Sequence, residues 1–371
     1  KVLLVTGCMA ERYRDEIIEE IPEVDAVLGT NSYDKILDAI QDVLGGDRFQ
    51  EYADLKGLPK IDAQRVVTTG GHYEYLKIAE GCDKHCTYCI IPKLRGPYRS
   101  VPMEELIAEA KTMAEQGVKE LVLVAQETTI YGIDLYGKPS LHLLLKRARA
   151  KIQVALLDPD SVLLSGGHLS GTRYRPMKEE PKVCHYLDLP IQHANDEILR
   201  RMGRRTSKQE LIDKIDFLRS EMPDITLRTT LITGFPGETK EQHKELLEFI
   251  NDMEFDRLGV FTYSPEEGTP AAAMEHQIDE EVKLDRQAEL MELQQDISAE
   301  LGERRIGQEL LVMIEGKVAD EDAYVGRSQA DAPSVDGYVF VNTPETLVSG
   351  DFVRVKITGA LEYDLIGEIS Q

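Results

Sequence analysis

Residues 81–89 read GCDKHCTYC and place Cys82, Cys86 and Cys89 in the spacing C-x3-C-x2-C. A structural zinc site closes with four ligands, whereas each iron of a [4Fe–4S] cube takes one thiolate. Three cysteines on one short loop therefore predict a cube with one iron left open to a substrate or cofactor. Tyr88 comes directly before the last cysteine, where it would stack on a flat ligand or simply pack against the loop.

Other uses of these cysteines fit less well. Zinc held together with His85 or His72 is an alternative, but zinc motifs usually come as two separated pairs of ligands. Disulfides are disfavoured because the cysteine count, five in 371 residues, is low and odd. We also expect no signal peptide, so the composition suits a reducing cytosol and a cytoplasmic protein.

The charge of the chain is strongly acidic, with 43 Lys and Arg against 67 Asp and Glu, a net charge of −24. Nucleic-acid binding draws much of its affinity from Lys and Arg that neutralise phosphates. The composition therefore favours a basic protein over a nucleic acid as the main partner. No apolar run reaches the roughly 18 residues that a membrane span needs, so we expect no membrane association.

The pattern from residue 68 to residue 303 alternates between apolar strands and amphipathic helices. Capping boxes at Ser207–Glu210 and Thr239–Gln242 predict two helix starts. Further helices are predicted over 102–116 and 279–302. The predicted strands are 75–82, 121–126, 186–192, 225–235 and 258–264. This alternation predicts a parallel sheet closed into a barrel or partial barrel, with its active site at the carboxyl ends of the strands.

Two smaller units flank this region. Residues 1–67 predict part of an α/β layer, with strands at 1–7 and 24–30, helices at 11–20 and 33–44, and a polar connector at 45–66. Residues 304–371 hold short alternating strands and predict a small antiparallel β-barrel. The fold class is therefore α/β, in three domains: 1–67, 68–303 and 304–371. Because the chain opens within a strand, we expect an N-terminal portion to be missing.

One window, residues 147–176, is rich in Gly and Ser and lacks the periodicity of the strand and helix expected there. Codons for residues 158–168 can be chosen so that the next frame reads IRIRYCYPEGI, a better strand followed by a turn. We hypothesise a pair of compensating frameshifts, which the gene sequence would test.

The cysteine string resembles the hallmark C-x3-C-x-aromatic-C of the radical S-adenosylmethionine (SAM) superfamily. Within it, the chain resembles the RimO-type methylthiotransferases that modify a small-subunit ribosomal protein, over nearly all residues except 147–176. The end barrel looks like a TRAM domain. The matching segments are AQETTIYG (125–132), YLDLPIQHANDEILRRMGRRTS (186–207), LRTTLITGFPGETKEQ (227–242), FDRLGVFTYSPEEGTPA (255–271) and YVGRSQADAPSVDGYVFV (324–341).

This resemblance implies that Cys82, Cys86 and Cys89 hold a cluster whose open iron binds SAM. It implies a second [4Fe–4S] cluster on three cysteines of the N-terminal domain; Cys8 matches the last of these, and the other two would lie upstream. One SAM would methylate sulfur at the second cluster, and another would yield a 5′-deoxyadenosyl radical. That radical would remove hydrogen from the β-carbon of an aspartate on the basic ribosomal protein. A monomer with an electron donor such as flavodoxin or ferredoxin is expected.

Further residues are candidates for binding SAM. Gln126 and Glu127 follow an apolar strand and would hold the methionine amino group, or cap a turn. Gln192 and Arg228 would face the same cavity, or serve only the fold. Gly234, in the GFPGE turn, would let the backbone approach a ligand, or only make the turn.

Two alternatives for the function stay open. The first is the same chemistry on a tRNA adenosine, but residues 306–371 carry 4 Lys and Arg against 12 Asp and Glu, a net charge of −8 that would repel phosphate. The same charge would attract a basic ribosomal protein. The second alternative is a truncated, non-catalytic fragment that binds the ribosomal protein without modifying it.

Overall fold

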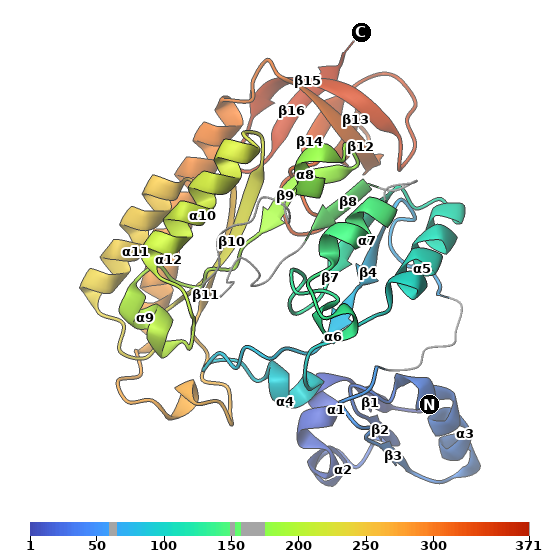
Figure 1. Ribbon diagram of the computed structural model, residues 1–371. Coiled ribbons are helices and arrows are strands. Elements are labelled where there is room, and N and C mark those ends of the chain that lie inside the picture. The colour runs from blue at the N-terminus through green and yellow to red at the C-terminus, as the bar shows by residue number, and fades with distance from the viewer. Residues whose placement is uncertain (59–64, 149–152, 157–174, 371) are drawn as a thin grey trace.

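The computed structural model describes residues 1–58, 65–148, 153–156 and 175–370. Figure 1 shows a small N-terminal sheet and a C-terminal barrel at opposite ends of a large central sheet. Within the aperiodic window 147–176, residues 158–168, on which the hypothesised frameshift falls, lie outside the described residues, whereas Gln153–Leu156 form a strand. No helix in the described ranges is both long and apolar enough to cross a membrane.

The N-terminal sheet is parallel, in the order β1-β2-β3. Its strands are β1 (Leu4–Thr6), β2 (Ala26–Leu28) and β3 (Phe49–Glu51). Its helices are α1 (Cys8–Tyr13), α2 (Asp15–Glu20), the 3-10 helix η1 (Tyr33–Lys35) and α3 (Ile36–Gly45). The central strand β2 is fully buried, as expected for an α/β layer.

Two predictions for this region were wrong. The single helix predicted over 11–20 is two helices, because Arg14 adopts a positive φ of 39° between them and its guanidinium turns back to the Glu11 carboxylate at 2.6 Å. The predicted connector 45–66 contains strand β3, whose polar sequence does not show the pattern of a strand. Phe49 and its neighbours become a strand only because β2 offers them a pairing edge.

The central sheet is parallel throughout, and its strands follow each other in chain order from one edge to the other. They are β4 (Tyr73–Lys77), β7 (Glu120–Val124), β8 (Gln153–Leu156), β9 (Val183–Asp188), β10 (Thr226–Thr233) and β11 (Arg257–Thr262). Crossovers of one hand produce this order and curve the sheet into a partial barrel, which confirms the predicted architecture.

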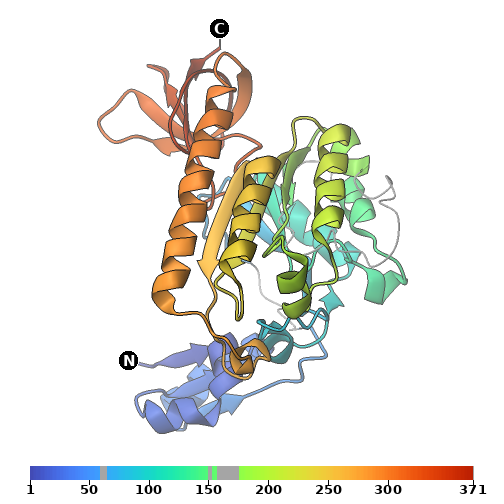
Figure 2. The same ribbon diagram turned by 90° about the vertical axis from the view of Figure 1, so that its left-hand side faces the viewer.

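Helices cover the outer face of this sheet (Figures 1 and 2). Both predicted capping boxes are present, at Ser207 and Thr239; such caps stabilise a helix by about 1 kcal/mol. The long helices are α5 (Met103–Glu115), α7 (Leu141–Ala148), α10 (Lys208–Glu221), α11 (Lys240–Met253) and α12 (Glu280–Glu303). The short elements are β5 (Ala79–Glu80), α4 (Ile91–Arg95), β6 (Arg99–Ser100), α6 (Ile133–Tyr136), α8 (Arg175–Glu179), α9 (Asp196–Arg201) and η2 (Ala271–Ala273).

Helix α12 protects the edge strand β11. Gln287 donates to the Val260 carbonyl of this strand at 2.6 Å, and two buried side chains donate to carbonyls just before and after it: Gln294 to Phe255 at 2.8 Å and Lys283 to Tyr263 at 2.9 Å. An unpaired strand edge is a template for unwanted pairing. The polar residues of α12 therefore close this edge, although the helix is charged on most faces.

The C-terminal domain is a closed barrel in the order β12-β13-β14-β16-β15. Its strands are β12 (Glu309–Lys317), β13 (Ala323–Arg327), β14 (Val339–Asn342), β15 (Phe352–Ala360) and β16 (Leu365–Ile369). Neighbouring strands run antiparallel, as predicted, except that β14 and β16 run parallel. Alternate apolar side chains such as Val312 and Ile314 fill its interior.

Candidate functional site

A cavity of about 360 Å³ opens at the carboxyl ends of the central strands. Three separate segments build it: the cysteine loop after β4, the residues after β7, and the residues after β9. Of the sequence-predicted site residues, it brings together Cys82, Cys86, Tyr88, Cys89, Gln126 and Gln192. The other lining residues are Lys84, His85, Ile91, Pro92, Ala125 and Arg204.

The cysteine loop begins with a turn that only glycine can make. Gly81 has a φ of 80°, and a Cβ there would collide with the Pro97 carbonyl. The Cys82 amide donates to the Gly96 carbonyl at 3.2 Å, and the Cys89 amide closes a turn onto Cys86 at 3.0 Å. These bonds fold the loop back on itself, so that all three cysteines line one cavity.

Thr87 fastens the middle of this loop to the far side of the barrel. Its amide donates to the Met202 carbonyl at 2.9 Å and its hydroxyl to the Arg201 carbonyl at 2.8 Å. Its own carbonyl accepts from the Ala271 amide at 2.9 Å. The cysteine loop follows the edge strand β4 and Ala271 follows the edge strand β11, so this last bond crosses the opening between the two edges of the sheet.

The donor set fits an iron–sulfur cluster, because three thiols share one wall of the cavity and thiolates are the usual ligands of such clusters. Burial raises the pKa of the Cys82 thiol to about 11. This thiol would therefore release a proton when it binds a metal ion. Among the described residues, no group of three or more His, Cys, Asp or Glu already converges in metal-ligating geometry.

Gln126 and Gln192 reach the cavity by different means. The Gln126 side-chain oxygen accepts from the Gly81 amide at 2.9 Å, so it also supports the start of the cysteine loop. Gln192 has a φ of 69° and is held between two bonds to β10, from its amide to Thr230 at 2.9 Å and from Ile232 to its carbonyl at 2.8 Å. Such strained backbone is found where the fold must aim a side chain at a site.

The structure does not bring Glu127, Arg228 and Gly234 to the cavity wall. Glu127 is buried and its carboxylate lies 3.1 Å from the Lys84 ammonium. Arg228 contacts the Asp188 carboxylate at 2.7 Å and lies 3.5 Å from the Asp336 carboxylate of the C-terminal domain, and it does not line the cavity. Gly234 has a φ of 71°, and a Cβ there would collide with Lys283, so the turn and its packing already account for this glycine.

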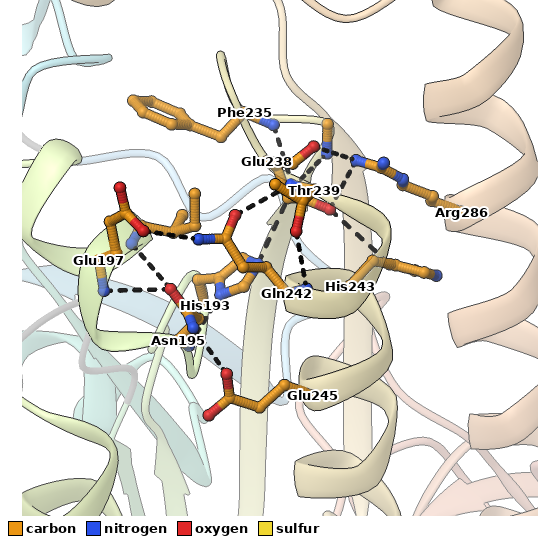
Figure 3. Close-up of polar contacts among 12 residues, drawn as sticks. His193, Asn195, Glu197, Phe235, Glu238, Thr239, Gln242, His243, Glu245 and Arg286 are labelled. Atoms are coloured by element: carbon orange, nitrogen blue, oxygen red, sulfur yellow. Dashed lines mark hydrogen bonds and ion pairs between the residues drawn. The ribbon is translucent and has the colours of Figure 1, made fainter.

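Figure 3 shows a polar network around the buried Glu238, in the turn after β10, that sequence reasoning missed. The Glu238 carboxylate accepts from the Gly234 amide at 2.7 Å, the Phe235 amide at 3.1 Å and the Arg286 guanidinium at 3.0 Å. Burial raises the pKa of Glu238 and lowers that of His193, which is fully buried beside it, to about 3. The network fixes the turn after β10; the Gly-x-x-Gly-Glu sequence of that turn was its only local signal.

Cys8, the first residue of α1 in the N-terminal domain, lies next to α4, the helix that follows the cysteine loop. The Arg95 guanidinium of α4 donates to the Cys8 sulfur at 3.2 Å and lies 3.3 Å from the Glu80 carboxylate. A second contact joins Arg12 to Glu266 at 2.6 Å. Because α4 follows Cys89 directly, the N-terminal sheet is held against the carboxyl ends of the central strands (Figure 1).

Comparison with known proteins gives the class of protein that this fold and site define. Residues 76–250 match the family model of the radical SAM superfamily, and residues 306–369 match that of the TRAM domain. This superfamily uses SAM together with a [4Fe–4S] cluster. The structure of the cobalamin-dependent SAM radical enzyme OxsB gives a TM-score of 0.49 at 14% identity, covering 78% of this chain and 43% of that chain.

Curated relatives narrow the class to one family. The ribosomal protein uS12 methylthiotransferase RimO of Lachnoclostridium phytofermentans is 56% identical over 99% of this chain and 83% of its own length. The enzyme of the same name from Clostridioides difficile is 46% identical over 100% of this chain and 82% of its own length. The chain therefore belongs to the RimO family of radical SAM methylthiotransferases.

Proposed function

We propose that this enzyme transfers a methylthio group to the β-carbon of an aspartate on ribosomal protein uS12. The observation that carries the proposal is the cavity in which Cys82, Cys86 and Cys89 meet Gln126 and Gln192. It occurs in a chain that is 56% identical to a uS12 methylthiotransferase along nearly its whole length.

In this proposal the three cysteines bind a [4Fe–4S] cluster, and Tyr88, Gln126 and Gln192 contact the SAM that it binds. When bound, the cluster and SAM supply a carbon radical, which can remove hydrogen from a carbon that has no acidic proton. The chain's own residues orient the bound groups and keep water from the radical. The Gln126 amide group is well placed for this, because its oxygen is already fixed on the loop that carries Cys82.

A second [4Fe–4S] cluster, which would carry the sulfur, is proposed at the N-terminal sheet with Cys8 as one ligand. Two features support this placement. Cys8 lies beside α4, the helix that follows the cysteine loop. The Arg95 guanidinium of this helix donates to the Cys8 sulfur.

The charge of the end barrel supports a basic protein as the substrate. Residues 306–371 carry 12 acidic against 4 basic residues, and one of the basic ones, Arg327, is buried against Glu120 at 2.6 Å. Asp331 and Asp336 are buried as well, so 10 acidic and 3 basic residues remain, an excess of 7 acidic residues. This excess would repel tRNA phosphates and steer a basic ribosomal protein toward the enzyme.

The proposal also covers the domain bounds, the oligomeric state and the electron donor of the enzyme. The domains are 1–67, 68–303 and 304–371, which agrees with the separate sheets at both ends of the chain. The enzyme acts as a monomer, and a flavodoxin or ferredoxin supplies electrons. Neither expectation affects the assignment of the reaction itself.

Anaerobic incubation of the iron-reconstituted enzyme with uS12, SAM, a sulfur source and dithionite tests the proposed function. Mass spectrometry should find one added methylthio group on an aspartate of uS12. The matched control is Cys184→Ala, since Cys184 is a buried thiol on β9 outside the cavity and its loss should leave the reaction intact. Modification of a tRNA adenosine, with uS12 unchanged, would contradict the proposal.

A further inference from the structure

Residues 200–208 are the most basic stretch beside the cavity. They read RRMGRRTSK and contain five Lys and Arg without any Asp or Glu, in a chain whose net charge is −24. A basic stretch is unusual in so acidic a surface, and it follows α9 directly at the carboxyl end of the barrel. The proposed reaction with a basic ribosomal protein gives it no role, because like charges repel.

Two of these cations face solvent without a partner. Arg200 and Arg205 are exposed, and within the described part of the chain neither side chain forms an ion pair or a hydrogen bond. The others differ: Arg204 is buried on the cavity wall, and Lys208 pairs with Glu245 at 3.1 Å. Arg200 and Arg205 are therefore the charges that an approaching molecule would meet; we name them the arginine pair.

The backbone between the two arginines packs directly against the cysteine loop. Gly203, between the two arginines, packs so closely that a Cβ there would lie 3.4 Å from the Thr87 amide nitrogen and 3.6 Å from the Cys86 Cα. The Thr87 amide also donates to Met202 at 2.9 Å. The arginine pair therefore flanks a stretch of backbone that is in contact with the loop that carries Cys86.

We propose that the arginine pair is the docking surface for an acidic one-electron carrier that reduces the cluster; this inference rests on the proposed function of the cysteine loop. One electron leaves the reduced carrier and enters the bound cluster. The carrier is oxidised by one electron, and no atom is transferred. The rate of electron transfer falls steeply with the distance between carrier and cluster. The carrier is therefore expected to bind where the enzyme surface lies close to a cluster ligand.

Charge and size favour this partner over RNA. Because the enzyme is acidic overall, an acidic carrier is repelled everywhere except at a local basic surface, which makes a small docking surface selective. Electron-transfer complexes are typically small and transient. An RNA that bound with comparable affinity would need several contacts between its phosphates and Lys or Arg side chains. Residues 196 and 197, at the other end of α9, are acidic and would repel a phosphate.

The test uses the iron-reconstituted enzyme and an acidic bacterial flavodoxin. The double charge reversal Arg200→Glu with Arg205→Glu is compared with Lys317→Glu with Lys356→Glu, the same charge change at exposed sites on the end barrel. Calorimetric titration at 50 mM salt should show about tenfold weaker flavodoxin binding for the first variant and unchanged binding for the second. Raising the salt to 200 mM should weaken binding of the wild type and remove most of the difference.

A second readout separates electron delivery from the chemistry. With reduced flavodoxin, the arginine-pair variant should form 5′-deoxyadenosine about tenfold more slowly than wild type. With dithionite, which needs no docking surface, the two should be equal. Equal flavodoxin affinity in variant and wild type, an equal loss in both charge-reversal variants, or the same loss with dithionite would overturn the inference. If wild type forms no 5′-deoxyadenosine even with dithionite, the proposed function fails, while the titration still measures docking.

Discussion

The two ends of the central sheet are built from similar residues but are used in opposite ways. At the end that faces the C-terminal barrel, Arg228 meets Asp188 at 2.7 Å and Asp336 at 3.5 Å, and the Tyr186 hydroxyl donates to Asp336 at 2.7 Å. A loop of the end barrel thus seals that end with paired charges. At the carboxyl end, polar and thiol side chains instead line an open cavity.

The two ends also differ in how they affect the free energy of folding. Burial raises the pKa of Asp188 and of Asp336, and the charge of Arg228 opposes this rise at both carboxylates. The carboxyl end holds residues in unfavourable backbone conformations, His85 and Gln192, whose φ angles are 51° and 69°. The sealed end therefore stabilises the fold, and the open end holds strained backbone and thiol side chains that suit catalysis.

Removing a cluster ligand should produce the largest effect and confine it to the open end. Cys86→Ala should lower bound iron to a small fraction of wild type and reduce 5′-deoxyadenosine formation by at least about a thousandfold, because the cysteine loop has no spare thiol. Iron analysis and product chromatography measure this. Retention of full iron content and activity would show that Cys86 is not a ligand.

Breaking the sealed end should instead cost stability and leave the chemistry alone. Asp336→Ala removes a carboxylate that is 3% exposed and leaves Tyr186 without its acceptor, so we expect a loss of about 3 kcal/mol in the free energy of unfolding. Denaturant titration measures it. Glu309→Ala, which breaks the exposed pair with Arg354, is the control and should cost under about 0.5 kcal/mol. If Asp336→Ala lost iron without losing stability, the two ends would not be separate.

A smaller effect is expected where the open end is fastened. Thr87→Val keeps the shape of the side chain but removes the hydroxyl that donates to Arg201, a bond of about 1 kcal/mol. Iron should then leave for a chelator about fivefold faster, with a changed electron paramagnetic resonance signal of the reduced cluster. Thr87→Ser keeps the hydroxyl and should restore both. Equal iron loss in Thr87→Val and wild type would mean that the hydroxyl does not hold the loop.

Local sequence was enough where the signal lies within a few residues. The C-x3-C-x2-C spacing, the apolar strand 121–126 and the capping boxes at Ser207 and Thr239 each depend on neighbours along the chain, and each predicted element is present. The alternation of strands and helices likewise predicted a partial barrel, because crossovers of one hand leave few ways to order parallel strands.

Other features depend on contacts between distant residues and could not be predicted locally. Strand β3 forms only beside β2, and the helix predicted over 11–20 breaks where Arg14 turns back to Glu11. Arg228 was expected to face the cavity, and its spacing along β10 gave no sign that Asp188 and a loop from the end barrel would take it instead.

The sequence alone thus determined that three thiols share one loop at the carboxyl end of a parallel sheet, because that information lies in spacing and periodicity. Only the tertiary structure decided what surrounds that loop. Thr87 forms backbone hydrogen bonds with Met202 and Ala271, which lie 115 and 184 positions after it in the chain. Such contacts exist only after the strands have paired, since pairing is what carries remote backbone to within hydrogen-bonding distance.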